Sequence, residues 1–252
     1  RRAVEYLVDR FESIGLTSGT NDPGNPWLAP VQLTSVRASR SDVELLVEGN
    51  RVTLREEEAV AVTTRQLELI AEVDMVFVGF EAQSVPTERV MGKAVVMLAG
   101  SSLNPERRIL LEEKQAAAVI VVPPNAELVA RVRRESGREK TALTGEIDEA
   151  FAVVATPEGM ARAFGEERWQ ALIKSALSED FEPIDLRAKA NIEARSERRD
   201  FTSHNVLGRL GGTNPDAKAV VLIAHWDHLG ECGAPDAQDR SCNGAGDNAS
   251  GV

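Results

Sequence analysis

Three side chains close to the C-terminal end of the sequence could hold a metal ion: His225, Asp227 and Asp247. Imidazole nitrogens and carboxylate oxygens are common ligands of Zn²⁺. A carboxylate has two oxygens, so one aspartate can bridge two ions. A bridged pair of ions binds a water molecule, lowers its pKa and polarises a carbonyl group. These residue types therefore predict metal-assisted hydrolysis.

The order of the surrounding residues supports this interpretation. The apolar run at residues 219–224 predicts a buried central strand. It leads directly into His-Trp-Asp-His at residues 225–228, at the strand end where open α/β sheets bind their ligands. A Gly-rich loop follows, and residues 243–251 then predict a turn and the start of a helix, with Asp247 or Asn248 as its N-cap.

Each fragment of this pattern also has an ordinary explanation. A lone His-x-Asp often arises by chance, and a lone Gly-Asp-Asn is usually a turn. We interpret His228 as a hydrogen-bonded loop histidine and His204 as a strand residue. His225 and Asp227 could supply a metal ligand and the carboxylate that orients it, because a ligand histidine usually donates its second N–H to such a group. Only the ordered combination favours a metal site.

The segments AHWDHLG and NGAGDNASG resemble the motifs of the co-catalytic, two-zinc metallo-aminopeptidases, whose members commonly read AHxDHxG and NGAxDNASG. Glutamate carboxypeptidase and the transferrin receptor ectodomain are relatives. The resemblance implies that His225 binds one zinc ion, that Asp247 bridges two, and that Asp227 is a catalytic residue that orients His225. It also implies a cis peptide bond between Asp247 and Asn248. Gly246 departs from the acidic residue that the family often has there.

The implied activity is that of a hydrolase that removes N-terminal residues from peptide substrates through a metal-bridged water. The family completes its site with a Glu-Glu pair, a further Asp and a final His. We expect these residues to lie beyond Val252, so that this chain carries only part of the active site and is inactive or nearly so. The pairs Glu56-Glu57 and Glu112-Glu113 precede the motif and are interpreted as solvated faces.

Two other functions remain open. A non-catalytic receptor or binding module of the same family is one, although His225 and Asp247 argue against it because members without metal have less reason to keep both. A related dipeptidase or carboxypeptidase is the other, because the specificity pocket is expected downstream. A one-zinc cyclase on the same scaffold fits the bridging motif poorly.

The predicted fold is α/β, with a mainly parallel peptidase sheet flanked by helices, incomplete here and interrupted by an inserted domain. Residues 1–60 are predicted as the N-terminal part of the peptidase domain and residues 181–252 as the first part of the zinc catalytic core, truncated. Residues 61–180 resemble the small α/β protease-associated domain that many members insert. The segments that suggest it are VDMVFVGF, GKAVVMLAG and AAAVIVVPP.

Hydrophobic periodicity predicts the individual elements. A helix is expected from residue 4 to residue 14, ended by Gly15, and a turn at 48–50. Residues 131–148 are expected to be exposed, and 196–200 to form a charged hairpin tip. Further helices are expected at 104–117 (capped by Asn104) and 156–177, and strands at 30–38, 43–47, 52–54, 73–80, 94–98, 118–122, 151–155, 184–194 and 205–210.

The composition is ordinary for a globular protein, with 42% hydrophobic and 27% charged residues. The net charge of −11 makes nucleic-acid binding unfavourable. No apolar run reaches the roughly 18–20 residues of a membrane span. Cys232 and Cys242 are either free thiols or a local disulfide, and the family is usually exported, so a secreted or periplasmic location is expected. The oligomeric state is open.

Overall fold

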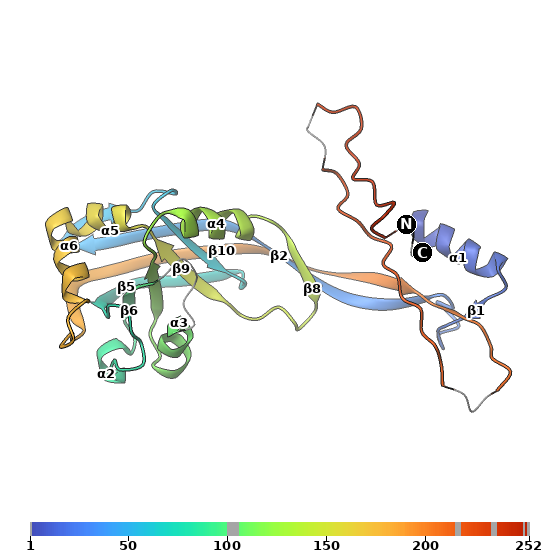
Figure 1. Ribbon diagram of the computed structural model, residues 1–252, viewed down its shortest axis with the longest axis horizontal. Helices are drawn as coiled ribbons and strands as arrows, with labels where there is room; N and C mark the ends of the chain where they lie inside the picture. Colours follow the sequence, from blue (N-terminus) through green and yellow to red (C-terminus); the bar gives the residue numbers. More distant parts are fainter. Residues whose placement is uncertain (1, 100–105, 215–217, 233–235, 249, 251–252) are drawn as a thin grey trace. The chain divides into compact units, whose positions relative to one another are not determined.

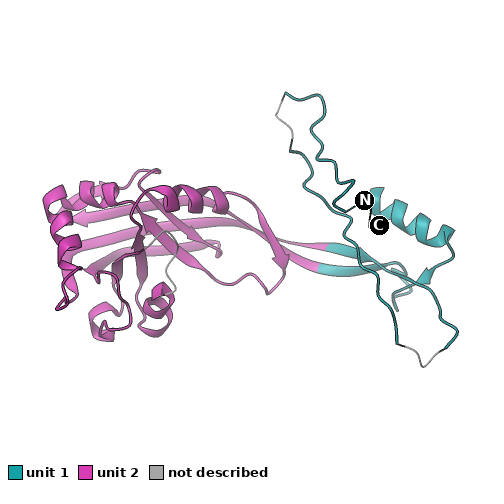
Figure 2. Ribbon diagram, viewed as in Figure 1, with its two compact units in different colours: residues 1–31, 203–252 teal, residues 32–202 magenta. Residues whose placement is uncertain are grey.

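The computed structural model describes residues 2–99, 106–214, 218–232, 236–248 and 250. The chain divides into two compact units (Figure 2). Unit 1 comprises residues 1–31 and 203–252, and unit 2 comprises residues 32–202. No helix in the described part of the chain is long and apolar enough to cross a membrane.

The main sheet is mixed, and its strand order is β3-β2-β10-β5-β6-β7-β9-β4, with β8 paired to β2 (Figure 1). The parallel pairs among the described strands are β5–β6, β6–β7 and β7–β9, and the pairs β10–β5, β2–β3, β2–β8 and β4–β9 are antiparallel. The α/β class is confirmed. The expectation of a mainly parallel sheet is confirmed only in part, because the sheet is mixed and its parallel pairs are those of β5, β6, β7 and β9. The bounds are β2 Leu28–Val47, β3 Asn50–Thr53, β4 Ala59–Thr63, β5 Leu67–Phe77, β6 Ala94–Leu98, β7 Ala118–Val122, β8 Lys140–Leu143, β9 Phe151–Ala155 and β10 Ile184–Val206.

The strands β6, β7 and β9 match their predicted bounds, and their residues are almost all buried because helices cover both faces. Alternate side chains point to opposite faces, so the strands divide their apolar residues between two clusters. The larger cluster packs Phe77, Val96 and Ile120 against Met160, Trp169 and Leu172 of the helices α5 (Pro157–Phe164) and α6 (Glu166–Ser175). The other packs Val76, Val95 and Val121 against Val90 of α2 (Thr87–Val90) and Leu110 of the π-helical turn Ile109–Glu113, which follows α3 (Glu106–Arg108).

The single helix predicted over residues 156–177 is two helices in the structure. Thr156 caps α5, because its Oγ1 accepts a hydrogen bond of 3.0 Å from the Gly159 nitrogen. Gly165 ends α5 with φ of 86°, a conformation that side chains with a Cβ rarely adopt. The helix predicted to begin at Asn104 is α3 and its π-helical continuation, and Asn104 itself lies outside the described residues.

Glu58 joins the loop before β4 to α5. Its Oε1 accepts a 2.8 Å hydrogen bond from Arg162 Nε, and its Oε2 accepts hydrogen bonds from Arg162 Nη2 and the Arg55 nitrogen. The Glu58 side chain is only 9% exposed, so burial would favour the neutral acid. The hydrogen bonds from Arg162 outweigh this effect and hold the pKa of Glu58 below its usual value.

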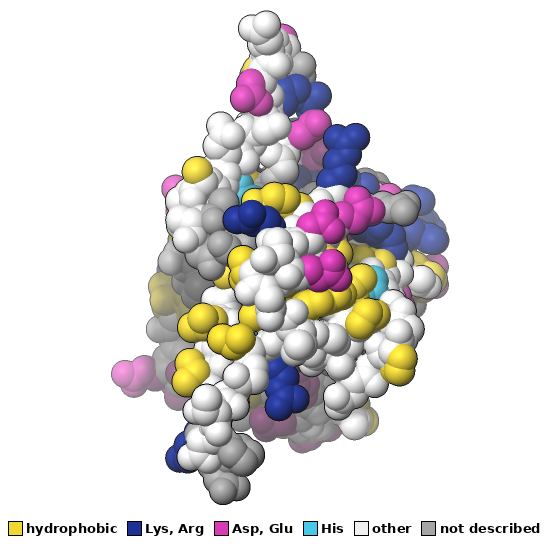
Figure 3. All heavy atoms as spheres, turned by 90° about the vertical axis from the view of Figure 1, so that its right-hand side faces the viewer, with side chains coloured by type: hydrophobic (Ala, Val, Ile, Leu, Met, Phe, Trp, Pro, Cys, Tyr) yellow, Lys and Arg dark blue, Asp and Glu magenta, His cyan; other side chains and the backbone are white. Residues whose placement is uncertain are grey.

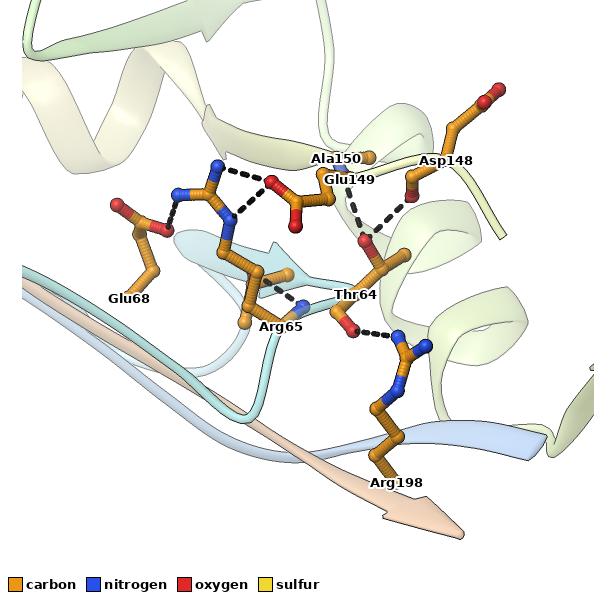
Figure 4. Close-up of polar contacts among 8 residues, drawn as sticks. Thr64, Arg65, Glu68, Asp148, Glu149, Ala150 and Arg198 are labelled. Carbon is orange, nitrogen blue, oxygen red and sulfur yellow. Dashed lines mark hydrogen bonds and ion pairs between the residues drawn. The ribbon is translucent and has the colours of Figure 1, made fainter. Parts of the chain in front are cut away.

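A polar network fixes the turn between β4 and β5 to the segment before β9 (Figure 4). Thr64 Oγ1 donates to the Asp148 carbonyl at 2.7 Å and accepts from the Ala150 nitrogen at 2.8 Å. Arg65 forms a 2.6 Å ion pair with Glu149. Both charged side chains are more than half exposed, so the neutral hydrogen bonds of Thr64 are the more important contacts for stability.

The structure corrects three predicted elements of unit 2. The strands predicted at 30–38 and 43–47 form one continuous strand, β2. The hairpin tip predicted at 196–200 is wrong, because β10 continues through it and Ser196 Oγ donates to the Thr63 carbonyl at 2.5 Å. The segment 131–148, expected to be exposed, is buried at Val132, which packs with Leu128 and Val129 of α4 (Glu127–Ser136) against Val60 and Val154, and the rest of it is exposed or partly exposed as predicted. The predicted turn at 48–50 is confirmed, with positive φ at Glu48 and Gly49.

Unit 1 begins with helix α1 (Arg2–Ser13), and Gly15, with φ of 83°, follows its end as predicted. The short strand β1 (Thr17–Ser18) pairs antiparallel with β11 (Gly208–Arg209). Phe11 and Trp27 form an edge-to-face contact with ring centroids 6.3 Å apart. A Cβ at Gly208 would come within 2.7 Å of Phe11 and Leu16, so glycine permits this close approach.

The buried strand predicted at residues 219–224 is absent from the described structure. Val220, Val221, Leu222 and Ile223 are 72–93% exposed, and no described segment is paired with them in a ladder. A strand needs neighbouring strands to satisfy its backbone groups and helices to cover its apolar side chains. The described residues supply neither, so the run has no regular secondary structure. Apolar side chains are correspondingly visible on the surface shown in Figure 3.

Candidate metal centre

His225 and Asp247 come together in unit 1. His225 follows the extended apolar run, and Asp247 lies in the turn at residues 245–248. The distance from His225 Nε2 to Asp247 Oδ1 is 2.9 Å. The side chains are 49% and 76% exposed, respectively, so the pair lies at the surface. The structure therefore brings together the two residues that the sequence predicts as metal ligands.

Asp227 contacts the other nitrogen of the same ring, mainly through its backbone. The distance from His225 Nδ1 to the Asp227 carbonyl oxygen is 3.0 Å, whereas the distance to the carboxylate Oδ1 is 3.7 Å. A carbonyl oxygen can only accept, so Nδ1 carries the proton in this contact. In the neutral ring, Nε2 then has the free lone pair, and this nitrogen faces Asp247. Sequence patterns could not have identified the backbone carbonyl as the closer partner.

The surroundings of His225 favour its charged form. Its pKa is raised above the usual value, first because the ring donates to the Asp227 carbonyl, and then because the carboxylates of Asp247 and Asp227 lie nearby. A metal ion competes with protons for the same nitrogen. Metal binding here would consequently weaken as the pH falls and the imidazole becomes protonated.

The donor pair fits part of a zinc site. Two ligands of a tetrahedral zinc ion, each bound at about 2.0–2.1 Å, lie roughly 3.3 Å apart. The 2.9 Å separation of His225 Nε2 and Asp247 Oδ1 is close to this value. A complete site needs three or four protein ligands. No group of three or more His, Cys, Asp or Glu side chains suited to a metal occurs among the described residues.

The other predicted features of this segment can be located as well. The Asp247–Asn248 peptide bond is cis, as the resemblance implies. Residues 245–248 form a turn as expected, and most of the residues after it lie outside the described ones. His204 is a strand residue of β10, as predicted. His228 lies beside Gly244, where a Cβ would be 3.0 Å from the ring carbon Cγ.

Cys232 and Cys242 form a disulfide, with their Cα atoms 5.5 Å apart. They close the loop at residues 232–242, and we call its closed end, at residues 230–232 and 240–242, the neck. The segment before the loop, residues 225–231, is the arm that bears His225, and the segment after it, residues 243–248, is the arm that bears Asp247. The Cys232 nitrogen donates to the Arg240 carbonyl at 2.9 Å, and the Cys242 nitrogen donates to the Gly230 carbonyl at 2.7 Å. The sequence left open whether these cysteines are free thiols or a local disulfide, and in the structure they form the disulfide.

Comparison with known proteins gives a family match at the same end of the chain. The profile of Peptidase family M28 matches residues 205–252, which include the three candidate site residues. No curated protein sequence is similar enough to this chain to count as a match.

Several solved structures are similar to the chain at low sequence identity. An aminopeptidase from Aneurinibacillus sp. strain AM-1 is 20% identical, with a TM-score of 0.44, and the match covers 85% of this chain and 43% of that one. A peptidase M28 precursor from Shewanella amazonensis SB2B is 14% identical, with a TM-score of 0.37 and coverages of 81% and 43%. BSAP, a zinc aminopeptidase from Bacillus subtilis, is 16% identical, with a TM-score of 0.30 and coverages of 85% and 48%. The chain thus spans less than half the length of each.

Proposed function

From the Peptidase family M28 segment at residues 205–252, we propose that this protein is a zinc-dependent aminopeptidase and that the chain carries part of its active site. One observation carries the proposal. His225 Nε2 faces Asp247 Oδ1 at 2.9 Å, while the Nδ1 of the same ring is held by the Asp227 carbonyl. An imidazole oriented in this way toward a carboxylate is suited to share a metal ion with it.

Each of the three residues has a distinct role in this proposal. His225 presents Nε2 as a ligand, and Asp247 presents a carboxylate whose second oxygen is available to a second ion. Asp227 holds the ring of His225 in position. A bound zinc ion supplies a Lewis acid that activates water and polarises the peptide carbonyl.

The proposal is tested by zinc analysis of the intact protein. We expect bound zinc in the wild type and its loss from the His225→Ala and Asp247→Ala variants, because each removes a ligand. His204→Ala is the matched control, since His204 lies on β10 and is not part of the site, and it should retain zinc. Far-ultraviolet circular dichroism should show that all variants remain folded.

The activity is tested separately with aminoacyl anilides and blocked peptides. Zinc-dependent release of the anilide from substrates with a free N-terminus is expected. Cleavage only at the C-terminus of peptides would replace the aminopeptidase assignment with a carboxypeptidase. Absence of both zinc and turnover from the intact protein would contradict the enzyme proposal and favour the receptor function.

We also propose a secreted or periplasmic location. The disulfide between Cys232 and Cys242 supports this, because such bonds persist mainly in oxidising compartments. Cell fractionation, with alkylation of free thiols before lysis, tests the location. Recovery of the protein in the cytosol with both thiols alkylated would contradict it.

A further inference from the structure

We infer that the Cys232–Cys242 disulfide is a positioning element for the metal centre: it holds the arm that bears His225 close to the arm that bears Asp247 and thereby raises the affinity for zinc. This inference rests on the proposed function. It assigns a role to two residues that are not ligands themselves, because both sulfur atoms are used in the cross-link.

The cross-link closes a short antiparallel hairpin. Glu231 and Ser241 form an isolated β-bridge, and the two hydrogen bonds of the neck lie beside it. Arg240 also forms a 2.8 Å ion pair with Glu231. The Cα separation of 5.5 Å at the disulfide is ordinary for such a bond, so the hairpin and the cross-link are mutually compatible.

Apart from the 2.9 Å contact between His225 and Asp247, the described residues supply few other contacts that hold the two sides of the disulfide together. An isolated two-stranded hairpin is marginally stable in water. The side chains of Arg240 and Glu231 are 46% and 66% exposed, so their ion pair contributes little. Nearer the site, the Asn248 side chain reaches the His225 carbonyl only at 3.5 Å. The disulfide is therefore the one covalent restraint between the two arms.

The two ligands lie just outside the loop that the cross-link closes. His225 precedes Cys232, and Asp247 follows Cys242. Opening the bond lengthens the shortest covalent path between the two ligands, and a longer path lowers the effective concentration of one ligand near the other. Loss of the cross-link also removes a restraint on the unbound state. We expect zinc affinity to fall about tenfold or more without the bond.

The test compares zinc dissociation constants of the intact protein, purified without reductant, by competition with a chromophoric chelator. The Cys232→Ser/Cys242→Ser double variant should bind zinc about tenfold more weakly than the wild type or worse. Glu231→Ala is the matched control at the same neck, and its affinity should stay within about twofold because its ion pair is exposed. Visible absorption of Co²⁺ in the site should differ in the double variant.

A chemical rescue separates positioning from general damage. A dithiol reductant cleaves the disulfide, giving two protein thiols and the oxidised, cyclic reductant. After the reductant is removed, diiodomethane alkylates both thiols: each sulfur displaces one iodide ion and gives up its proton to the buffer, and a methylene group then joins the two sulfurs. The rejoined protein should recover the affinity of the wild type, although it no longer contains a disulfide.

The outcomes distinguish this inference from the proposed function. Zinc binding that depends on His225 but changes by less than about twofold in the double variant overturns the positioning role and leaves the function intact. Failure of the methylene bridge to restore an affinity lost on reduction also overturns it. If the wild type binds no zinc, the proposed function fails, and the inference fails with it.

Discussion

His225 and Asp247 lie within hydrogen-bond distance of each other, with 2.9 Å between Nε2 and Oδ1, although a disulfide-closed loop separates them in the sequence. Both side chains are substantially exposed, so their contact contributes little to folding. The contact joins the two residues that we propose as zinc ligands. The nearby Asp227 carbonyl selects the ring orientation that this binding needs.

Replacement of Asp227 by asparagine should weaken zinc binding less than tenfold. The closer partner of the His225 ring is the backbone carbonyl of residue 227, which the substitution retains, whereas the carboxylate is 3.7 Å away. Loss of a residue that orients a metal ligand typically costs about 10–100-fold in affinity. Chelator competition measures the effect. A loss as large as that of His225→Ala would show that the carboxylate is itself a ligand.

Replacement of Glu58 by glutamine should lower the free energy of unfolding of unit 2 by about 1–3 kcal/mol at neutral pH, because charged hydrogen bonds to Arg162 are lost. The folded pKa of Glu58 is lowered, so its contribution is complete above the unfolded pKa. The contribution disappears as the pH falls through the folded value. Urea unfolding of both proteins at several pH values measures this, with Glu57→Gln as the exposed control.

The expected result is that the difference in the free energy of unfolding between wild type and Glu58→Gln becomes smaller as the pH falls. A difference that is constant from neutral pH to about pH 3 would contradict the assignment, because the unfolded carboxyl titrates near pH 4.3. Such a constant difference would point to altered packing around Gly159, where a Cβ atom, if present, would lie 2.9 Å from the Cβ of Glu58.

Replacement of Trp169 by alanine should destabilise unit 2 by about 3–5 kcal/mol, because a fully buried side chain in contact with Phe77 is removed. Replacement by phenylalanine should cost clearly less. The Trp169 Nε1–H has no hydrogen-bond partner among the described residues, so no polar contact is lost with the indole. Chemical unfolding followed by circular dichroism measures both variants. If the alanine and phenylalanine variants lost the same free energy of unfolding, the result would indicate that the indole N–H makes a polar contact.

Replacement of Ile223 by serine should leave the unfolding of unit 2 unchanged within about 0.5 kcal/mol and reduce self-association of the chain. Ile223 is 90% exposed within a run of exposed apolar side chains, and such runs promote association. Analytical ultracentrifugation and urea unfolding measure the two effects. The exposed but isolated Leu177, replaced in the same way, serves as the control. If Ile223→Ser self-associated as much as the wild type, the exposed apolar run around Ile223 would not be the cause of the association.

The elements that the sequence predicts best are those determined by local patterns. The strands at 94–98, 118–122 and 151–155 agree with the structure because their continuous apolar residues suit a strand buried on both faces. Glu48 and Gly49 form the predicted turn, and Thr156 caps its helix through a short-range hydrogen bond. Each of these features depends on residues close together in the chain.

The candidate ligands were also predicted from the sequence, since histidine and aspartate in this ordered pattern favour a metal site before any geometry is known. Only the tertiary structure could show that Nε2 of His225 faces Asp247, that the carbonyl of Asp227 holds Nδ1, and that Cys232 and Cys242 are joined. It also decided that residues 220–223 are exposed and outside any strand, and that β10 continues through residues 196–200. The physical reason is that pairing and burial depend on which neighbours a segment meets, whereas turns, caps and ligand chemistry are properties of the segment itself.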